Sequence, residues 1–399
     1  MSYFKRLIVI TLGLATLIPV TVVRAETLHE VFEAAWNKQP VQRSQAARMS
    51  EFEAKKQAAA NLTPQPTSIS LGQRSDQIGS NVGQRQTDIE FAAPLWLPGQ
   101  RDNQRAIVEA ETSQFTGTQT FSRWRLAGEV RDLWWATRIA EAEKILANQR
   151  VLSAQKLLAD VERRVKAGDL ARVDANRVNV ELQTALIALK VADAQAFRAL
   201  QQFNALTGLA NLPQESEQLG QQAVDKHPQR LAAQSLLLAQ KRLDLIRSTP
   251  REAPELSLGL TRQKDIANDP YNNSISLKLK IPFASDALNQ QRLASVQAEQ
   301  AEAEAEQSLE NARIEADISS ARFELEQANA SLSLAESRFN TALDTQQLLD
   351  RSFNLGESDL PSRLLAEAAR FEAERNLVKA RLETGRAISK VNQALGVLP

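Results

Sequence analysis

Short stretches of strict alternation between apolar and polar residues predict four β-strands, because side chains along a strand point to its two faces in turn. The strands are expected over 67–74, 87–93, 255–262 and 274–281. The polar faces of the second and fourth strands carry full charges, at Asp88, Glu90, Lys278 and Lys280. An ordinary half-buried sheet would also alternate. The strand lengths of about 8–10 residues suit a tilted membrane span and the charged faces suit a wet lumen, so the pattern favours a membrane barrel.

Most of the remaining chain has the periodicity of helices, and two of these helices are very long. They are expected over 102–166 and 286–353, which contain no proline. Shorter helices are expected over 27–60, 171–206, 217–249 and 359–394. Two heptad seams run along the second long helix, at Ile318, Leu325, Leu332, Phe339, Gln346 and Phe353, and at Ile314, Ala321, Ala328, Ala335, Ala342 and Leu349. A strict seven-residue repeat predicts left-handed coiled-coil packing.

The chain is duplicated with an offset of 188 residues. Pro66 recurs as Pro254, Pro94 as Pro282 and Gly168 as Gly356. Since proline and glycine punctuate secondary structure, matched punctuation predicts matched architecture in the two halves. We therefore expect a first structural repeat over 26–212 and a second over 213–399.

Four strands are too few to enclose a pore, and open sheet edges are not tolerated in lipid. Even an eight-stranded barrel is filled by its own side chains. A membrane barrel built from this chain must therefore be shared between several copies.

The N-terminus has the pattern of a secretory signal over 1–25. Lys5 and Arg6 form its charged region, an apolar run follows, and Val23-Arg24-Ala25 fits a small-residue cleavage site. A membrane anchor is the alternative, but Pro19 makes the apolar run short for a span. No later stretch is apolar for the roughly 20 residues of a membrane helix, so a membrane crossing would have to use strands.

The composition excludes several functional classes. The 399 residues carry 48 basic and 48 acidic side chains, a balance that argues against a nucleic-acid binder. With no cysteine, two histidines and two methionines, the chain offers no transition-metal cage. His227, beside Pro228, is expected to be a solvated turn residue. We see no catalytic constellation, and we expect neither an enzyme nor a cofactor. A soluble periplasmic coiled-coil scaffold or adaptor remains the alternative function.

The duplicated order of helix, paired strands, long helix and shorter helix resembles the TolC family of outer-membrane efflux ducts. The resemblance covers the whole mature chain. It includes the prolines at the strand ends, the turns at 168–170 and 356–358, and the closing signatures FNALTG at 203–208 and VNQALG at 391–396. The segment PLWLPGQR at 94–101 is similar to the strand-to-helix junction of the CzcC-like, heavy-metal branch.

The resemblance implies a mostly α fold with a small β part. Three copies would form a twelve-stranded barrel in the outer membrane of a Gram-negative cell and a helical tunnel in the periplasm. The implied partners are a periplasmic adaptor, an inner-membrane (RND-type) pump and outer-membrane lipid, and the implied role is efflux, including heavy-metal resistance. Adaptor docking is expected at Gly168, Asp169, Leu170, Gly356, Glu357 and Ser358.

The resemblance also implies two sets of gating groups. Asp174 stands where the family places an aspartate that helps to lock the closed tip, although a solvated helix residue is the alternative. The acidic ring of the second tip would fall at Ser362 and Leu365, which are not acidic here. Asp359 or Glu367 could replace it only by conjecture.

Overall fold

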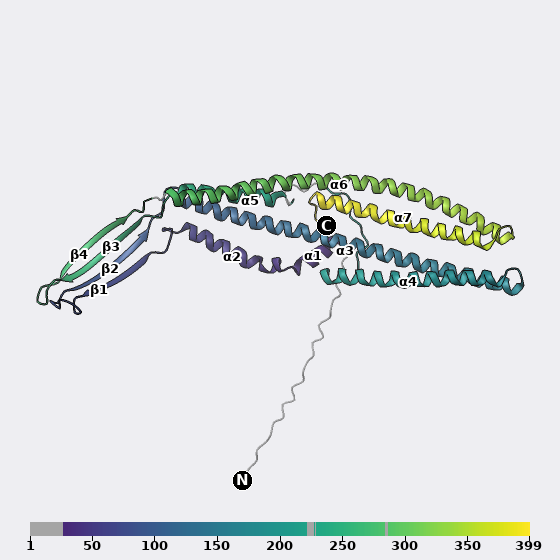
Figure 1. Ribbon diagram of the computed structural model, residues 1–399, viewed down its shortest axis with the longest axis horizontal. Helices are drawn as coiled ribbons and strands as arrows, with labels where there is room; N and C mark the ends of the chain where they lie inside the picture. Colours follow the sequence, from purple (N-terminus) through teal and green to yellow (C-terminus); the bar gives the residue numbers. More distant parts are fainter. Residues whose placement is uncertain (1–26, 222–226, 228, 284–285) are drawn as a thin grey trace, which may run out of the picture.

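The computed structural model describes residues 27–221, 227, 229–283 and 286–399, so the expected signal peptide at 1–25 lies outside the described residues. The molecule is mostly helical and elongated, with one four-stranded antiparallel sheet at one end (Figure 1).

Each half of the chain contributes two strands and a helical hairpin. The first half contains α1 (Leu28–Asn37), α2 (Pro40–Ala60), β1 (Ser68–Ser75), β2 (Arg85–Pro94), α3 (Gln100–Ala167) and α4 (Arg172–Thr207). The second half contains α5 (Gln229–Ser248), β3 (Glu255–Lys264), β4 (Asn272–Lys280), α6 (Asp286–Leu355) and α7 (Leu360–Ala394).

Two helices differ from the sequence expectation. The helix expected over 27–60 is broken before Pro40, which lacks an N–H group and begins α2 at its first position. The helix expected over 217–249 begins only at Gln229, and residues 217–221 form no regular structure. Their backbone is held instead by tertiary contacts, including a hydrogen bond from the Gly220 N–H group to the Asn392 side chain at 2.8 Å.

The sheet has the strand order β1-β2-β3-β4, and every neighbouring pair is antiparallel. The central pair joins the two halves of the chain, with Phe91 opposite Leu258 and Glu90 opposite Gly259. β1 and β4 are the outer strands, so among the residues that the structure describes each has one edge without a partner strand.

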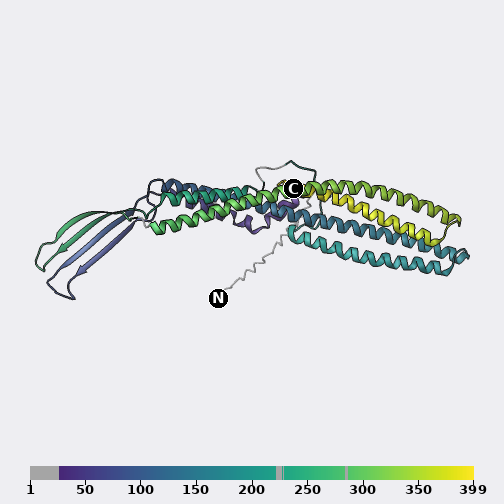
Figure 2. The same ribbon diagram turned by 45° about the horizontal axis from the view of Figure 1, so that its top comes forward.

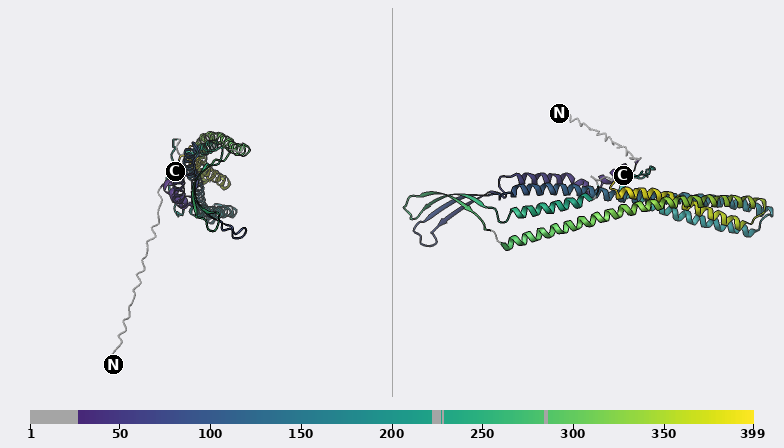
Figure 3. Two further views of the ribbon diagram at one scale, coloured as in Figure 1. Left: turned by 90° about the vertical axis from the view of Figure 1, so that its left-hand side faces the viewer. Right: turned by 90° about the horizontal axis from the view of Figure 1, so that it is seen from above.

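The helices form a wall that extends from the sheet to two hairpin turns at the far end (Figure 2). Near the sheet, α3 contacts α2 and α5, and α5 contacts α6. Towards the far end, the α3–α4 hairpin lies beside the α6–α7 hairpin through a contact between α3 and α7. Viewed along the long axis, the helices follow an arc (Figure 3). A single chain thus builds a curved segment of wall.

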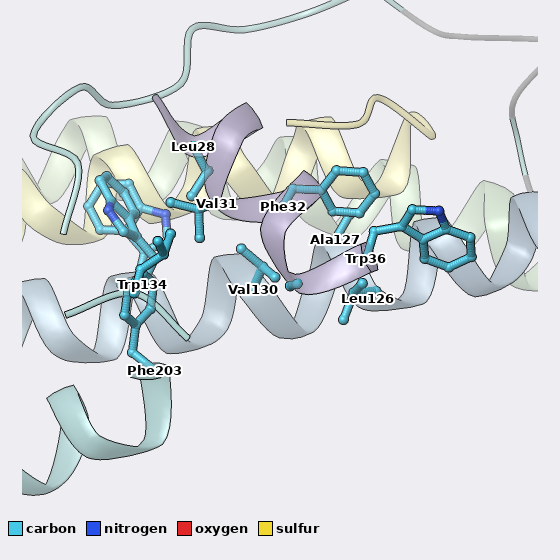
Figure 4. Packing of buried hydrophobic residues seen from close by; sticks show 12 residues of the cluster. Leu28, Val31, Phe32, Trp36, Leu126, Ala127, Val130, Trp134 and Phe203 are labelled. Atoms are coloured by element: carbon cyan, nitrogen blue, oxygen red, sulfur yellow. The ribbon is translucent and has the colours of Figure 1, made fainter. Parts of the chain in front are cut away.

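The main hydrophobic core lies midway along α3. Leu28, Val31, Phe32 and Trp36 of α1 pack on Leu126, Ala127, Val130 and Trp134 of α3 and on Phe203 of α4 (Figure 4). The rings of Trp134 and Trp135 meet edge to face, with centroids 4.4 Å apart. The indole N–H group of Trp134 donates to the Pro213 carbonyl at 3.1 Å, which ties the loop after α4 to this core.

A buried ion pair adjoins the core. Arg131 and Glu217 are 3% and 11% exposed, and the guanidinium donates to both carboxylate oxygens at 2.7 and 2.9 Å. The same guanidinium donates to the carbonyl of Val397 at 2.9 Å. Arg131 therefore joins α3 to the start of the second repeat and to the C-terminal segment.

The prediction that His227 is solvated is wrong. His227 is 2% exposed, and its Nδ1 atom accepts a hydrogen bond from the Gln229 N–H group at 3.2 Å. Nε2 therefore carries the proton and donates to the Ala394 carbonyl, 3.0 Å away. The ring is buried because it satisfies a carbonyl at the end of α7.

Candidate functional site

The first candidate site is the polar face of the sheet, which we call the charged strand face. The strand register places Asp88, Glu90, Lys278 and Lys280 on the same side. The Lys278 ammonium lies 3.4 Å from Glu90 Oε2, and the hydroxyl of Thr261 donates to Asp88 Oδ1 at 2.6 Å. The structure thus places these four predicted residues on one face of the sheet, although they come from strands of both repeats, and it pairs Glu90 with Lys278.

On the inner strands β2 and β3, the opposite, apolar face of the sheet is the more exposed one, whereas on β1 and β4 nearly every residue of both faces is exposed. The aliphatic side chains of the apolar face come from all four strands, and on the outer strands Leu71 is 77% exposed and Leu277 71% exposed. Asp88 and Glu90 on the charged strand face are half-buried. A sheet in water would bury its apolar face, so this arrangement is the reverse of an ordinary half-buried sheet.

The second candidate site is the pair of turns that end the helical hairpins, which we call the first tip (168–170) and the second tip (356–358). Gly168 and Gly356 have φ of 85° and 78°, a left-handed conformation that glycine adopts without strain. The next N–H groups, of Asp169 and Glu357, each donate back into the helix at 2.9 Å. The two tips therefore end in the same helix-terminating geometry.

Within the tips, the predicted docking residues divide between the surface and the interior. Asp169 and Glu357 are exposed, and a side chain added at either glycine would meet nothing within 4 Å. Leu170 packs against a buried cluster formed by Leu157, Val161, Val178, Phe353 and Leu360. Ser358 is partly covered and donates to the Leu349 carbonyl at 3.5 Å.

Asp174, the expected gating residue, makes local contacts. Its carboxylate accepts from the Ala171 N–H group at 3.3 Å and pairs with Arg177 at 3.3 Å. Both partners lie at the start of α4 or just before it. In the single chain, Asp174 therefore stabilises the N-terminus of its own helix, where a negative charge is favoured.

The two candidate replacements for the acidic ring have opposite environments. Asp359 caps α7 by accepting from the Ser362 N–H group at 3.0 Å, and hydrogen bonds from Ser362 lower the pKa of this carboxyl. Burial raises the pKa of Glu367 above its ordinary value, and this effect exceeds the opposing influence of Arg363. Glu367 lines a small gap between the hairpins, together with Arg150 and Glu181.

Sequence reasoning missed the residues that join the two tips. Arg164 of α3 donates to Asn354 of α6 at 2.8 Å, and its guanidinium lies 4.9 Å from the centre of the Phe353 ring. Arg363 of α7 lies 5.1 Å from the same ring and pairs with Asp350. The available signal was Phe353 itself, a large aromatic residue that ends the heptad seam just before a tip glycine.

Within the described ranges, no group of three or more histidine, cysteine or carboxylate side chains could hold a metal ion. None of the helices in the described part of the chain combines the length and apolar character needed to cross a bilayer.

The fold is similar to those of solved outer-membrane channels. VceC from Vibrio cholerae superposes with a TM-score of 0.75 at 13% identity, over 93% of this chain and 96% of VceC. CusC, described in terms of transmembrane channel formation, gives 0.74 at 16% identity over 93% and 92% of the two chains. The open state of the MtrE outer-membrane channel of Neisseria gonorrhoeae gives 0.71 at 15% over 93% and 89%. No protein-family model and no curated protein matches the chain.

Proposed function

We propose that this chain, whose fold is that of the TolC-like outer-membrane channels, is the outer-membrane duct of a tripartite efflux system. Three copies would share one β-barrel in the outer membrane of a Gram-negative cell and extend their helices as a tube into the periplasm. A periplasmic adaptor and an inner-membrane (RND-type) pump would deliver the cargo. We assign the chain no catalytic role.

The observation that carries this proposal is the reversed exposure of the sheet. On the inner strands, Phe91 and Leu258 are 45% and 49% exposed, whereas on the other face Ser257 is 5% exposed and Glu90 pairs with Lys278. Exposed aliphatic side chains are stabilised by lipid, and charged side chains by a water-filled lumen. The sheet therefore suits a barrel wall with lipid outside and water inside.

The free edges of the sheet support assembly from several copies. β1 and β4 each leave one row of backbone hydrogen-bonding groups without a partner in the chain. In lipid, each unsatisfied group costs several kcal/mol, so a membrane sheet must close on itself. Since four strands cannot enclose a lumen, further copies must supply the remaining strands.

The internal duplication indicates how the helical walls of two copies would meet. Trp135 of α3 lies against Gly385 of α7, where an added Cβ would come within 2.3 Å of the indole ring. The equivalent positions, 188 residues away, are Phe323 of α6 and Phe197 of α4, which are 61% and 66% exposed. We expect these two rings to meet across the boundary between neighbouring copies.

The tips are the proposed docking surface for the adaptor. They lie at the end of the molecule opposite the sheet (Figure 1), as a periplasmic entrance would require. Gly168, Asp169, Gly356 and Glu357 offer exposed backbone and side chains there, whereas Leu170 holds the tip to the core behind it. Gating at Asp174 would require a partner from another copy, because its contacts within the chain are local.

For the cargo, we propose heavy-metal cations on the resemblance of residues 94–101 alone. Within the structure, this segment fixes the strand to the helices: the Trp96 indole donates to the Asn61 carbonyl at 3.1 Å, and Arg101 donates to the Ala60 carbonyl. The metal ion would pass in hydrated form, because the side chains along the channel would offer oxygen ligands and lysine ammonium groups. A strain lacking the chain should become sensitive to metal salts and not to organic dyes; the opposite sensitivity would reverse this assignment.

The duct is tested with the purified mature chain in detergent. We expect light scattering to give the mass of three chains, and planar bilayers to show a conducting pore. The matched variant is Lys278→Glu, which should change the ion selectivity of the pore without closing it. A water-soluble monomer that does not conduct would contradict the proposal and favour the periplasmic scaffold.

A further inference from the structure

The pairing of the two repeats within one chain predicts how the sheets of neighbouring copies would pair. β2 and β3 are the strands at which the first repeat meets the second within the chain. In a shared barrel, the second repeat of one copy must meet the first repeat of the next, and the strands that do so are β4 and β1. The observed β2–β3 register therefore predicts the register of the boundary between copies.

The equivalence of the strands can be read at single-residue precision. Ser70-Leu71-Gly72 of β1 recurs as Ser257-Leu258-Gly259 of β3, at an offset of 187, while β2 and β4 keep the offset of 188. The hairpin registers agree with this assignment. Gly72 lies opposite Asp88, and Gly259 lies opposite Ser276, which is the equivalent of Asp88.

Within the chain, Glu90 lies opposite Gly259. Lys278 is the equivalent of Glu90, and Gly72 is the equivalent of Gly259. We propose that β4 of one copy pairs with β1 of the next in the register that sets Lys278 opposite Gly72, so that Lys278 bridges Glu90 of its own sheet and Asp88 of the neighbouring copy. This inference rests on the proposed function, because it requires a shared barrel.

Strand geometry distinguishes the proposed register from registers shifted by one or two residues. A shift by one residue would turn Lys278 towards the apolar face, which excludes all odd shifts. A shift by two residues in either direction keeps the faces and must be judged by strand tilt. Gly72 of β1 lies opposite Asp88 of β2, and Asp88 lies opposite Thr261 of β3. Thr261 is two residues beyond Gly259, the equivalent of Gly72, so the pairing is staggered by two residues over two strand spacings.

This stagger fixes the tilt of the strands in the closed barrel. If the boundary between copies repeats the same stagger, the strands advance one residue per strand and tilt by about 35°, given the usual rise and strand spacing. The two shifted registers would give about 20° and about 47°. Membrane barrels tilt their strands by about 35–45°, which excludes the register at about 20°, and repetition of the stagger seen within the chain favours the proposed register over the one at about 47°.

The charges across the boundary are complementary. Lys278 already spans two strand spacings to reach Glu90, with the ammonium 3.4 Å from the carboxylate. In the proposed register, Asp88 of the neighbouring copy is two strand spacings away on the other side. Only Gly72 stands between them, and the absence of a side chain there leaves the path open. The lumen would therefore carry a continuous belt of alternating charges.

The register is tested by disulfide cross-linking, which suits a chain without native cysteine. Leu279→Cys is combined in turn with Ile69→Cys, Leu71→Cys and Gln73→Cys, and the detergent-purified proteins are oxidised and run on non-reducing gels. The proposed register predicts at least a tenfold faster cross-link with Leu71→Cys than with the other two. A dominant cross-link at Ile69→Cys or Gln73→Cys would overturn the register and leave the shared barrel intact.

Failure of the proposed function would look different. A chain that forms no intermolecular cross-link in any of the three variants and has the mass of a monomer would refute the shared barrel itself.

The bridge is tested separately by charge exchange in the trimer. Lys278→Glu should lower the temperature at which the trimer dissociates, and adding Asp88→Lys should restore at least half of the loss. Lys280→Glu is the comparison: the register sets Lys280 opposite Ser70, whose partner on β2 is Glu90, so Asp88→Lys should not restore the loss caused by Lys280→Glu. A double variant whose loss equals the sum of the two single losses would overturn the bridge.

Discussion

The two long helices have nearly the same length and equivalent positions in the duplicated chain, but very different surroundings. Of the 68 residues of α3, fifteen are buried, whereas of the 70 residues of α6 only Ile314, Ala321 and Phe353 are buried. The duplication of sequence has therefore not produced a duplication of environment within one chain. In the proposed assembly, α6 is the helix whose remaining partners would come from other copies.

The reason lies in the order of the elements along the wall. α3 is covered by α1 and α2 of its own repeat and also by α5 and α7 of the other repeat, whereas α6 contacts α5 and α7. Residues 217–221, which stand where the second repeat would place an equivalent of α1, instead approach α3, where Glu217 pairs with Arg131. Both repeats thus contribute to the burial of α3.

Removing a side chain from the core of α3 should have the largest effect. Trp134 is fully buried, so Trp134→Ala should lower the free energy of unfolding by about 3–5 kcal/mol through lost burial and a residual cavity. Chemical denaturation of the detergent-solubilised protein measures this loss. The equivalent position on α6 is Arg322, which is exposed, and Arg322→Ala should cost less than about 0.5 kcal/mol. Equal losses at the two positions would contradict the contrast between the helices.

The buried ion pair should be nearly as sensitive. Glu217→Ala leaves the Arg131 guanidinium without its carboxylate in a buried site, which should cost about 3 kcal/mol. On α6, the exposed pair of Glu324 with Lys390 should contribute less than about 1 kcal/mol, so Lys390→Ala serves as the control. The same denaturation measurement applies, and an equal cost for both variants would show that the α3 pair is not effectively buried.

A charge on the exposed face of α6 should act on assembly rather than on folding. Phe323→Asp should leave helix content unchanged but raise the monomer fraction in detergent at least tenfold, because the proposed contact with Phe197 of another copy is lost. Native mass spectrometry measures the fraction. Ile145→Asp is the matched control, since Ile145 is 59% exposed on α3, whose two sides are covered within the chain. Equal dissociation in both variants would argue against a specific contact.

The smallest effects concern the two acids near the second tip. The raised pKa of Glu367 means that the folded chain holds its proton to higher pH than the unfolded chain does. Stability is then lost as the pH rises above the ordinary value of 4.5, and Glu367→Gln should remove this loss.

Asp359 should behave in the opposite sense. Its lowered pKa, due to Ser362, stabilises the fold above the ordinary value of 3.8, and this stabilisation disappears as the pH falls. Asp359→Asn should flatten the acid limb of the stability profile, measured by thermal unfolding across pH. Identical profiles for the two variants would refute the contrast between the partly buried Glu367 and the exposed Asp359.

Much of the fold could be predicted because its signals are periodic and local. The alternation of the strands, the heptad seams and the duplicated prolines specify a mostly α chain with one small sheet, and the prediction of a TolC-like fold is confirmed. Every member of the two α6 seams is at least half-buried, while most other α6 residues are exposed. A heptad seam can be predicted from sequence because successive turns of the helix place its residues on the same, less exposed side.

The errors fell where tertiary contacts replace local preference. Residues 217–221 contain no helix-breaking proline, yet they form no helix, because Glu217 and Gly220 bind Arg131 and Asn392, which are distant in sequence. His227 looks like a polar turn residue until the end of α7 supplies a carbonyl for its ring. The joint formed by Arg164 and Phe353 depends on the relative placement of two hairpins, which no single segment encodes.

The stacking of Phe353 between Arg164 and Arg363 has a mechanical consequence. Because guanidinium groups of both hairpins lie close to the ring, separation of the hairpins at this end of the chain would first have to remove the Arg164 guanidinium from an aromatic ring. In the proposed tube, widening would then be concentrated at the boundaries between copies. The aperture would grow in proportion to the rotation of each subunit.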